Sequence, residues 1–133
     1  DGIFDGCTFV DSSGNTKWQP FCPASQTATA YCITAPSAMF LAQSNNTAIT
    51  QANVNKNVGF VTGAGTTIGG GFSGYLLDAA NIATTSTFPF RIVNLFSQIQ
   101  PNTSVNGADN SSAYNMAVVA FNSQDFKAGQ TGV

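Results

Sequence analysis

Side chains able to do acid–base, nucleophilic or metal chemistry are scarce in this 133-residue chain. It contains no His and no Glu, and its charged side chains are six Asp and four Lys or Arg. A cysteine nucleophile needs a base beside it to lower its pKa, and no histidine is present to act as one. Cys7, Cys22 and Cys32 are too few and too widely spaced for a metal cluster. The sequence therefore predicts no enzyme, no metal site and no cofactor.

Two weaker chemical signals are better explained by structure. The aspartates mostly stand beside Gly, Ser or Asn, where Asp commonly binds the backbone of a turn, so we do not interpret them as a catalytic pair. Residues 57–78 are rich in glycine but contain no lysine and no G-x-x-x-x-G-K-[ST] motif. We interpret their glycines as bulges and a hairpin tip, not as a nucleotide-binding loop.

The cysteine count leaves two states open. Three cysteines allow one disulfide plus one free thiol. The prediction we prefer is three reduced thiols that act as small buried hydrophobic groups.

Low charge is the most unusual property of the composition. Charged residues make up 8% of the chain, against about a quarter in an ordinary soluble domain, and the net charge is −2. No cluster of Lys or Arg is present, so nucleic acid and anionic membranes are poor partners, and no stretch has the ~18 apolar residues that span a bilayer. Ser, Thr, Asn and Gln supply the polarity instead. Such a surface suits a protein packed in an assembly, although an extracellular β-domain has a similar composition.

Arg91 stands alone among apolar residues in "TFPFRIVNLF", and two interpretations of it stay open. Its stem can pack while the guanidinium reaches the rim of the fold. Alternatively, the guanidinium pairs with an Asp of this or a neighbouring subunit.

The sequence pattern predicts that short strands position the residues discussed above. Residues 2–10 predict a strand, residues 11–15 a hairpin turn, and residues 16–21 a returning edge strand that Pro20 stops. Further strands are expected at residues 27–34, 38–43, 87–96 and 113–121. The last two are apolar on both faces, which predicts central strands covered on both sides. Helix should be confined to a turn or two near residues 48–55.

These elements predict an all-β fold: a compact β-sandwich or β-barrel, jelly-roll-like, of about seven or more short antiparallel strands in one domain over residues 1–133. Alternation places Ile3, Cys7 and Phe9 on one face of the first strand, opposite Phe4, Thr8 and Val10. In the third strand, alternation sets Thr29, Tyr31 and Ile33 against Ala28, Ala30 and Cys32.

Three segments, in order, resemble a known family. They are "GIFDGCTFVDSSGNTKWQPFCPAS", "FPFRIVNLF" and "AYNMAVVAFNSQDF" followed by "TGV". Together they resemble capsid cement (decoration) proteins of tailed double-stranded DNA bacteriophages, over most of residues 2–133. The chain departs from that family in having no His near "NSQDF". Family members commonly carry residues before the "G-[IV]-F-D-G" stretch, so an N-terminal segment is expected to precede Asp1.

The resemblance implies a non-catalytic virion protein. Many copies would assemble in the host cytoplasm and bind the outer surface of the capsid, with the major capsid protein and other copies of the chain, as a dimer or trimer, as partners. We expect contacts from the polar and Gly/Pro-rich segments at residues 18–25, 44–57 and 63–75, and the candidate interface residues are Trp18, Phe21, Arg91 and Tyr75. The alternative is a carbohydrate-binding module or adhesin that stacks an exposed aromatic ring on sugar.

Overall fold

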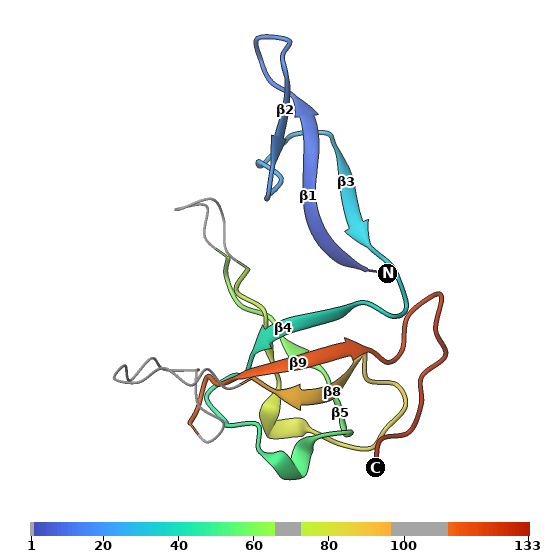
Figure 1. Ribbon diagram of the computed structural model, residues 1–133. Coiled ribbons are helices and arrows are strands. Elements are labelled where there is room, and N and C mark those ends of the chain that lie inside the picture. The colour runs from blue at the N-terminus through green and yellow to red at the C-terminus, as the bar shows by residue number, and fades with distance from the viewer. Residues whose placement is uncertain (1, 66–72, 97–111) are drawn as a thin grey trace. The chain divides into compact units, whose positions relative to one another are not determined.

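The computed structural model describes residues 2–65, 73–96 and 112–133 (Figure 1). In these residues it confirms an all-β, sandwich-like fold, with nine strands in antiparallel sheets. The strands are β1 (Ile3–Val10), β2 (Thr16–Gln19), β3 (Ala28–Ile33), β4 (Met39–Gln43), β5 (Asn57–Val58), β6 (Phe60–Val61), β7 (Leu76–Leu77), β8 (Phe90–Leu95) and β9 (Met116–Phe121).

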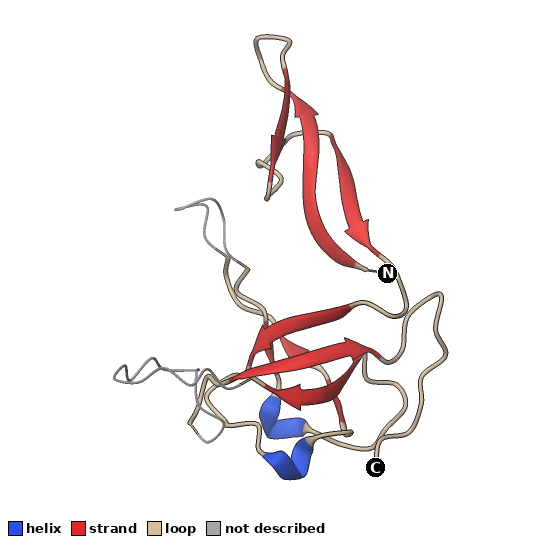
Figure 2. Cartoon of the chain, in the orientation of Figure 1, coloured by secondary structure: helices blue, strands red, loops and turns tan. Residues whose placement is uncertain are grey.

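Helix is limited, in the described residues, to two single 3-10 turns (Figure 2). One of them, η1 (Gln51–Asn53), lies where the sequence predicted a helical turn. The other, η3 (Ala79–Asn81), was not predicted. No helix in this part of the chain is long and apolar enough to cross a membrane.

The strands form three sheets in two compact units. The N-terminal unit, described at residues 2–34, 64–65 and 73–74, contains the three-stranded sheet β2-β1-β3. The larger unit, described at residues 35–63, 75–96 and 112–133, contains the four-stranded sheet β4-β9-β8-β5 and the two-stranded ribbon β6-β7. The expectation that residues 1–133 form a single domain stays a prediction.

The larger unit buries one face of its four-stranded sheet. The β8 and β9 strands lie at the centre of this sheet, as predicted. Their inward side chains are buried, and they are Phe90, Ile92, Ala117, Val119 and Phe121. The outward side chains of β9, Met116, Val118 and Ala120, are only half-buried. On the same face of the neighbouring β4, Met39 is 63% exposed and Leu41 49%. The prediction that both faces are covered is therefore wrong, and Val93, in a bulge of β8, is among the exposed residues.

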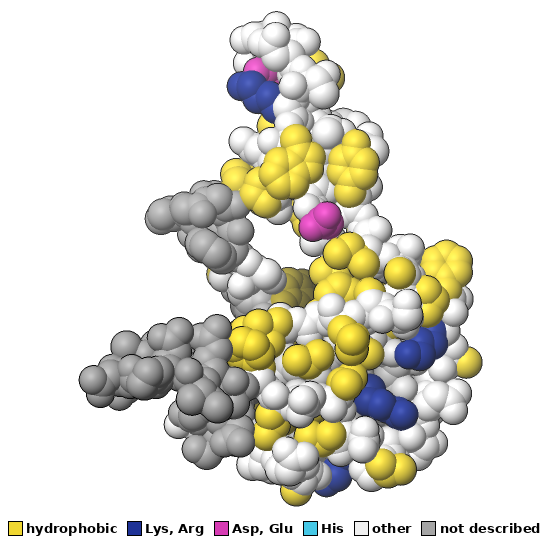
Figure 3. Space-filling view, viewed as in Figure 1, with side chains coloured by type: hydrophobic (Ala, Val, Ile, Leu, Met, Phe, Trp, Pro, Cys, Tyr) yellow, Lys and Arg dark blue, Asp and Glu magenta, His cyan; other side chains and the backbone are white. Residues whose placement is uncertain are grey.

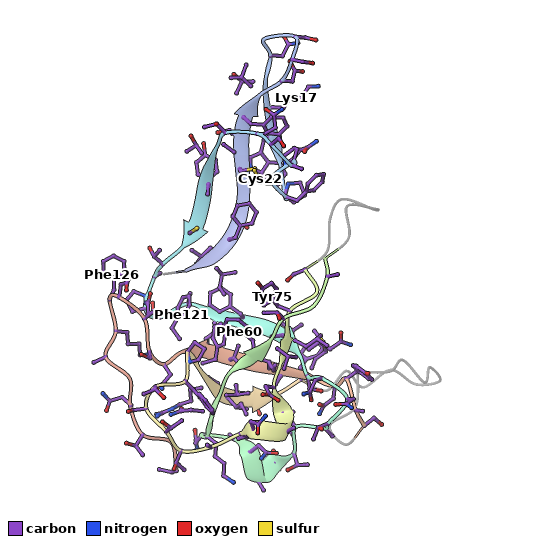
Figure 4. All side chains as sticks on the ribbon, turned by 180° about the vertical axis from the view of Figure 1, so that it is seen from behind. Lys17, Cys22, Phe60, Tyr75, Phe121 and Phe126 are labelled. Carbon is purple, nitrogen blue, oxygen red and sulfur yellow. The ribbon has the colours of Figure 1, made fainter. Side chains whose placement is uncertain are left out.

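Aromatic rings link the ribbon to this sheet. Phe121 contacts Phe40 edge-on at 5.0 Å between ring centroids and stacks on Phe90 at 5.9 Å. Phe60 of β6 lies 6.4 Å from Phe90 and 5.3 Å from Tyr75. This continuous row of rings packs the ribbon on the buried face of the sheet, and Figure 4 shows Phe60, Tyr75 and Phe121 on the same side of the unit.

Three fully buried asparagines hold the irregular segments of the larger unit. The Asn115 amide donates to the backbone oxygen of Ile49 at 2.7 Å, and its Oδ1 accepts from the Ser44 hydroxyl and the Ile49 N–H. The Asn122 amide donates to the carbonyls of Ser86 and Phe88. These side chains satisfy buried backbone N–H and C=O groups of the loops, which have no strand partner to bind.

Asn57 is the third of these residues. Its amide donates to the carbonyl oxygens of Thr85 at 2.8 Å and Gln130 at 2.7 Å. Since Ser44, Ile49 and Asn57 are all completely buried, residues 44–57 are anchored in their own unit at three points.

The core of the larger unit predicts unequal costs for two truncations. Phe90→Ala should lower the free energy of unfolding by about 3–5 kcal/mol, because it removes a buried ring that contacts two others. Val118→Ala should cost about 1 kcal/mol, because Val118 is half-buried on the outward face. Urea denaturation of both variants measures the difference. Equal losses would contradict the assignment of the buried face.

Candidate protein-binding surface

A bulge in β1 decides which side chains share a face of the three-stranded sheet. Ile3 pairs with Ile33 and Phe4 with Cys32, but the next pair is Gly6 with Tyr31, so Asp5 is an extra residue. The faces predicted by simple alternation are therefore wrong for Ile3 and Phe4, which exchange sides at the bulge. Gly6 has φ of +135°, a conformation that side-chain-bearing residues rarely adopt.

Trp18 covers this glycine. It pairs with Thr8 across the β1–β2 hairpin, and its indole reaches along the sheet to Gly6. A Cβ atom at position 6 would lie 2.6 Å from the Cζ2 atom of the indole. Gly6 is thus buried beneath a ring that is itself 57% exposed.

The same face carries further large apolar side chains. The register places Ile3, Thr8, Val10, Trp18, Tyr31 and Ile33 together, and we call this set the aromatic face. Val10 is 57% exposed and Tyr31 48%. The hydroxyls of Thr8 and Tyr31 lie 3.3 Å apart, within hydrogen-bonding distance. Figure 3 shows hydrophobic side chains gathered on this sheet.

The opposite face supplies a small core. Only Cys7 and Phe9 of β1 are buried there, and the thiol of Cys7 donates to the backbone oxygen of Phe21 at 3.4 Å. All three cysteines are free thiols, but Cys22 and Cys32 are exposed. The prediction of three buried thiols is correct for Cys7 and wrong for the other two.

Charge is confined to the ends of the hairpin. The turn at residues 11–15 is closed by the Asp11 carboxylate, which accepts from the N–H groups of Ser13 and Asn15. Lys17 lies 2.7 Å from the same carboxylate and, through its hydrogen bond, is the main reason that the Asp11 pKa falls to about 2. Asp5 is the one charged residue within β1 and β3. The aromatic face therefore presents almost no charge.

The four residues named as interface candidates lie in different units. Trp18 and the half-buried Phe21 belong to the N-terminal unit, whereas Tyr75 and Arg91 belong to the larger one. Tyr75 is 55% exposed and packs edge-on against Phe60. Trp18 is the one candidate that belongs to the aromatic face.

Arg91 binds neutral oxygens of its own chain. Its Nε donates to Asn57 Oδ1 at 3.1 Å, and its Nη2 donates to the backbone oxygens of Gln130 at 2.9 Å and Thr131 at 2.7 Å. In the described residues its guanidinium is therefore used to fasten the C-terminal segment. Arg91 is half-buried and its Nη2 hydrogen bonds lie at the surface, which agrees with the interpretation that the stem packs while the guanidinium reaches the rim. The pairing of Arg91 with an Asp of a neighbouring subunit stays a prediction.

The sequence did not single out Tyr31, Ile33 and Val10 as interface candidates. The signal was present, because the alternation in "TATAYCIT" already placed Tyr31 and Ile33 on one face. Their position on the same face as Trp18 depends on how the strands pair, and alternation within one strand does not predict that pairing.

Other kinds of site find no support in the described ranges. No group of three or more Cys and Asp side chains there is placed to hold a metal ion. No protein-family model, curated protein or solved structure matches the chain. The candidate site is therefore the aromatic face, which is defined by the strand pairing and by the exposure of its side chains.

The contact between Gly6 and Trp18 predicts a specific mutational effect. Gly6→Ala should destabilise the hairpin by about 1–3 kcal/mol, because the new Cβ forces both an unfavourable φ and displacement of the indole. Trp18 is the only tryptophan, so its fluorescence reports that displacement directly.

Gly14→Ala is the matched control. Gly14 also has a positive φ, of +82°, but nothing lies within 4 Å of a Cβ at this position. Gly14→Ala should lower the free energy of unfolding without changing the fluorescence emission of Trp18. The packing of the indole on Gly6 is refuted if both variants give the same emission spectrum.

Proposed function

We propose that the chain is a structural virion protein, a capsid cement protein of a tailed double-stranded DNA bacteriophage. It binds the outer surface of the shell built by the major capsid protein and stabilises that shell against the pressure of the packaged DNA. The aromatic face is the surface by which it attaches. The proposal rests on that face, on the charge-poor composition and on the resemblance of the three segments quoted above.

The aromatic face is the observation that supports attachment most strongly. Monomeric proteins seldom expose contiguous large apolar patches, and such patches commonly mark sites of protein contact. Trp and Tyr are also enriched among the residues that dominate binding energy. Here an exposed Trp and an exposed Tyr lie on the two outer strands of one sheet, and Val10 and Ile33 lie on the same face.

Low charge fits the same role. Burying a charged group against another protein costs several kcal/mol unless the group is paired, whereas neutral side chains lose much less. The charges of the hairpin tip already pair with each other, since Lys17 lies against Asp11. The sheet can thus be covered with little loss of solvation.

Stabilisation of the shell then follows from the coupling between binding and assembly. A protein that binds the assembled lattice and not free capsomers stabilises the lattice at every occupied site. Association of copies as a dimer or trimer adds avidity, because one assembly spans several capsomers. No catalytic group or cofactor takes part.

One observation favours the alternative, a carbohydrate-binding module or adhesin. A shallow hollow of about 220 Å³ includes Thr8 and Val10 of the aromatic face, and the threonine hydroxyls around it offer partners for a sugar. Its volume is below the roughly 300–1,000 Å³ of ordinary small-molecule sites, so we place protein attachment first. The hollow is lined by Thr8, Phe9, Val10, Thr16, Thr27, Ala28 and Thr29.

Replacing Trp18 tests the proposed attachment. Trp18→Ala should weaken binding to undecorated shells about tenfold or more, because it removes the largest side chain of the aromatic face. Binding is measured as occupancy on sedimented shells over a range of protein concentrations, with thermal melting of each variant beside it.

Phe126→Ala is the control, since Phe126 is 68% exposed but belongs to the larger unit. It should bind as the unchanged chain does. Full occupancy by Trp18→Ala, with a normal melting curve, would remove the aromatic face from the attachment site. Specific binding of the chain to a glycan array, with no binding to shells, would favour the alternative.

A further inference from the structure

Two of the three cysteines meet on the buried side of the three-stranded sheet. Cys7 is completely buried in β1, and its sulfur lies 3.4 Å from the backbone oxygen of Phe21. That carbonyl belongs to the peptide unit joining Phe21 to Cys22, so the Cys7 sulfur lies beside the peptide bond that leads into the second cysteine. Figure 4 shows Cys22 against the β1–β2 hairpin.

The electrostatics of Cys7 agree with this proximity. Burial is the main cause that raises its pKa, and the Cys22 thiol adds to the effect both as a neighbouring charge and as a hydrogen-bond partner. The Cys22 sulfur also faces the carbonyl oxygen of Pro23 at 3.6 Å. It therefore lies in a polar, exposed setting, while Cys7 lies beneath it in an apolar one.

We propose that Cys7 and Cys22 form an oxidisable thiol pair that glutathione disulfide converts into an intrachain disulfide, while Cys32 stays a free thiol. This is a modification site of the protein, and its reagent is an oxidised low-molecular-weight disulfide. The three-stranded sheet then has two states, one with both thiols reduced and one with the disulfide.

Cys32 is excluded by strand register. It pairs with Phe4, whereas Cys7 pairs with Ala30, so the two thiols are at best diagonal neighbours on adjacent strands. Such neighbours are separated by about 7–8 Å, whereas the Cβ atoms of a disulfide lie about 3.5–4.5 Å apart. Cys32, which is exposed as Cys22 is, thus serves as an internal control.

The unequal burial assigns an order to the reaction. The exposed Cys22 loses its proton and attacks one sulfur of glutathione disulfide, forming a mixed disulfide and releasing one glutathione. Cys7, deprotonated in turn, attacks the Cys22 sulfur, and the second glutathione leaves. The protein loses two electrons and two protons, and these convert glutathione disulfide into two glutathione thiols.

The bridge would fasten the segment after β2 to β1. Cys7 lies in the middle of β1, and Cys22 follows β2, so the closed loop contains the whole hairpin with Trp18. Closing such a loop of about 15 residues restricts the unfolded chain and favours the folded sheet. The consequence for the particle rests on the proposed function: the attachment face would become stiffer when particles leave a reducing cytoplasm.

The experiment needs only the purified chain and glutathione buffers. The reduced protein is equilibrated at rising ratios of glutathione disulfide to glutathione, denatured, alkylated, and measured by intact mass and peptide mapping. We expect a monomer about 2 Da lighter before alkylation, with Cys32 as the single alkylated thiol. Cys32→Ala should lose two thiols in the same way.

Cys22→Ser and Cys7→Ala are the matched variants, and each should keep both remaining thiols alkylatable or form only glutathione adducts. Hydrogen exchange should slow about tenfold or more in β1 and β2 of the oxidised chain. Three alkylated thiols at every ratio, a bridge that includes Cys32, or disulfide-linked dimers would each overturn the proposal. Since no capsid is used, such a failure leaves the proposed attachment to be judged by its own test.

Discussion

Neutral amide groups buried in the larger unit are the constraint on which its structure depends. Asn57, Asn115 and Asn122 are at most 2% exposed, and their side chains bind the backbone of segments that are not strands. An unpaired buried amide costs roughly 1–3 kcal/mol, so each of these groups restricts where the neighbouring loop can lie. Arg91 extends the network, since it donates to Asn57 and to the C-terminal backbone.

This internal use of amides helps to explain a composition with so few charges. In its described residues the larger unit fixes its loops without buried ion pairs, whose desolvation often outweighs their attraction. The N-terminal unit uses another solution, in which an indole closes over a glycine with positive φ and one face keeps only a two-residue core in β1. A sheet with so little buried surface gains stability when another surface covers it. Attachment to a capsid shell, as proposed, would supply that cover.

The sequence allowed the all-β class, the hairpin at Asp11, the edge position of β2 and the central position of β8 and β9 to be predicted. These depend on local alternation and turn chemistry, which neighbouring residues determine. The exchange of Ile3 and Phe4 could not be predicted, because one inserted residue reverses a strand's faces. The buried asparagines were also missed, since Asn57 and Asn115 bind partners 66 to 73 positions away. For the candidate site, Trp18 was recognised, but its grouping with Tyr31 and Ile33 required the pairing of β1 with both β2 and β3.

In the proposed attachment, the aromatic face of the N-terminal unit meets the capsid shell. A cryo-electron microscopy map of phage particles carrying this chain tests it most directly. We expect density for the β2-β1-β3 sheet on the outer surface of the shell, with Trp18 and Tyr31 buried against the major capsid protein. A map in which the chain is bound but these two side chains point into solvent would contradict it.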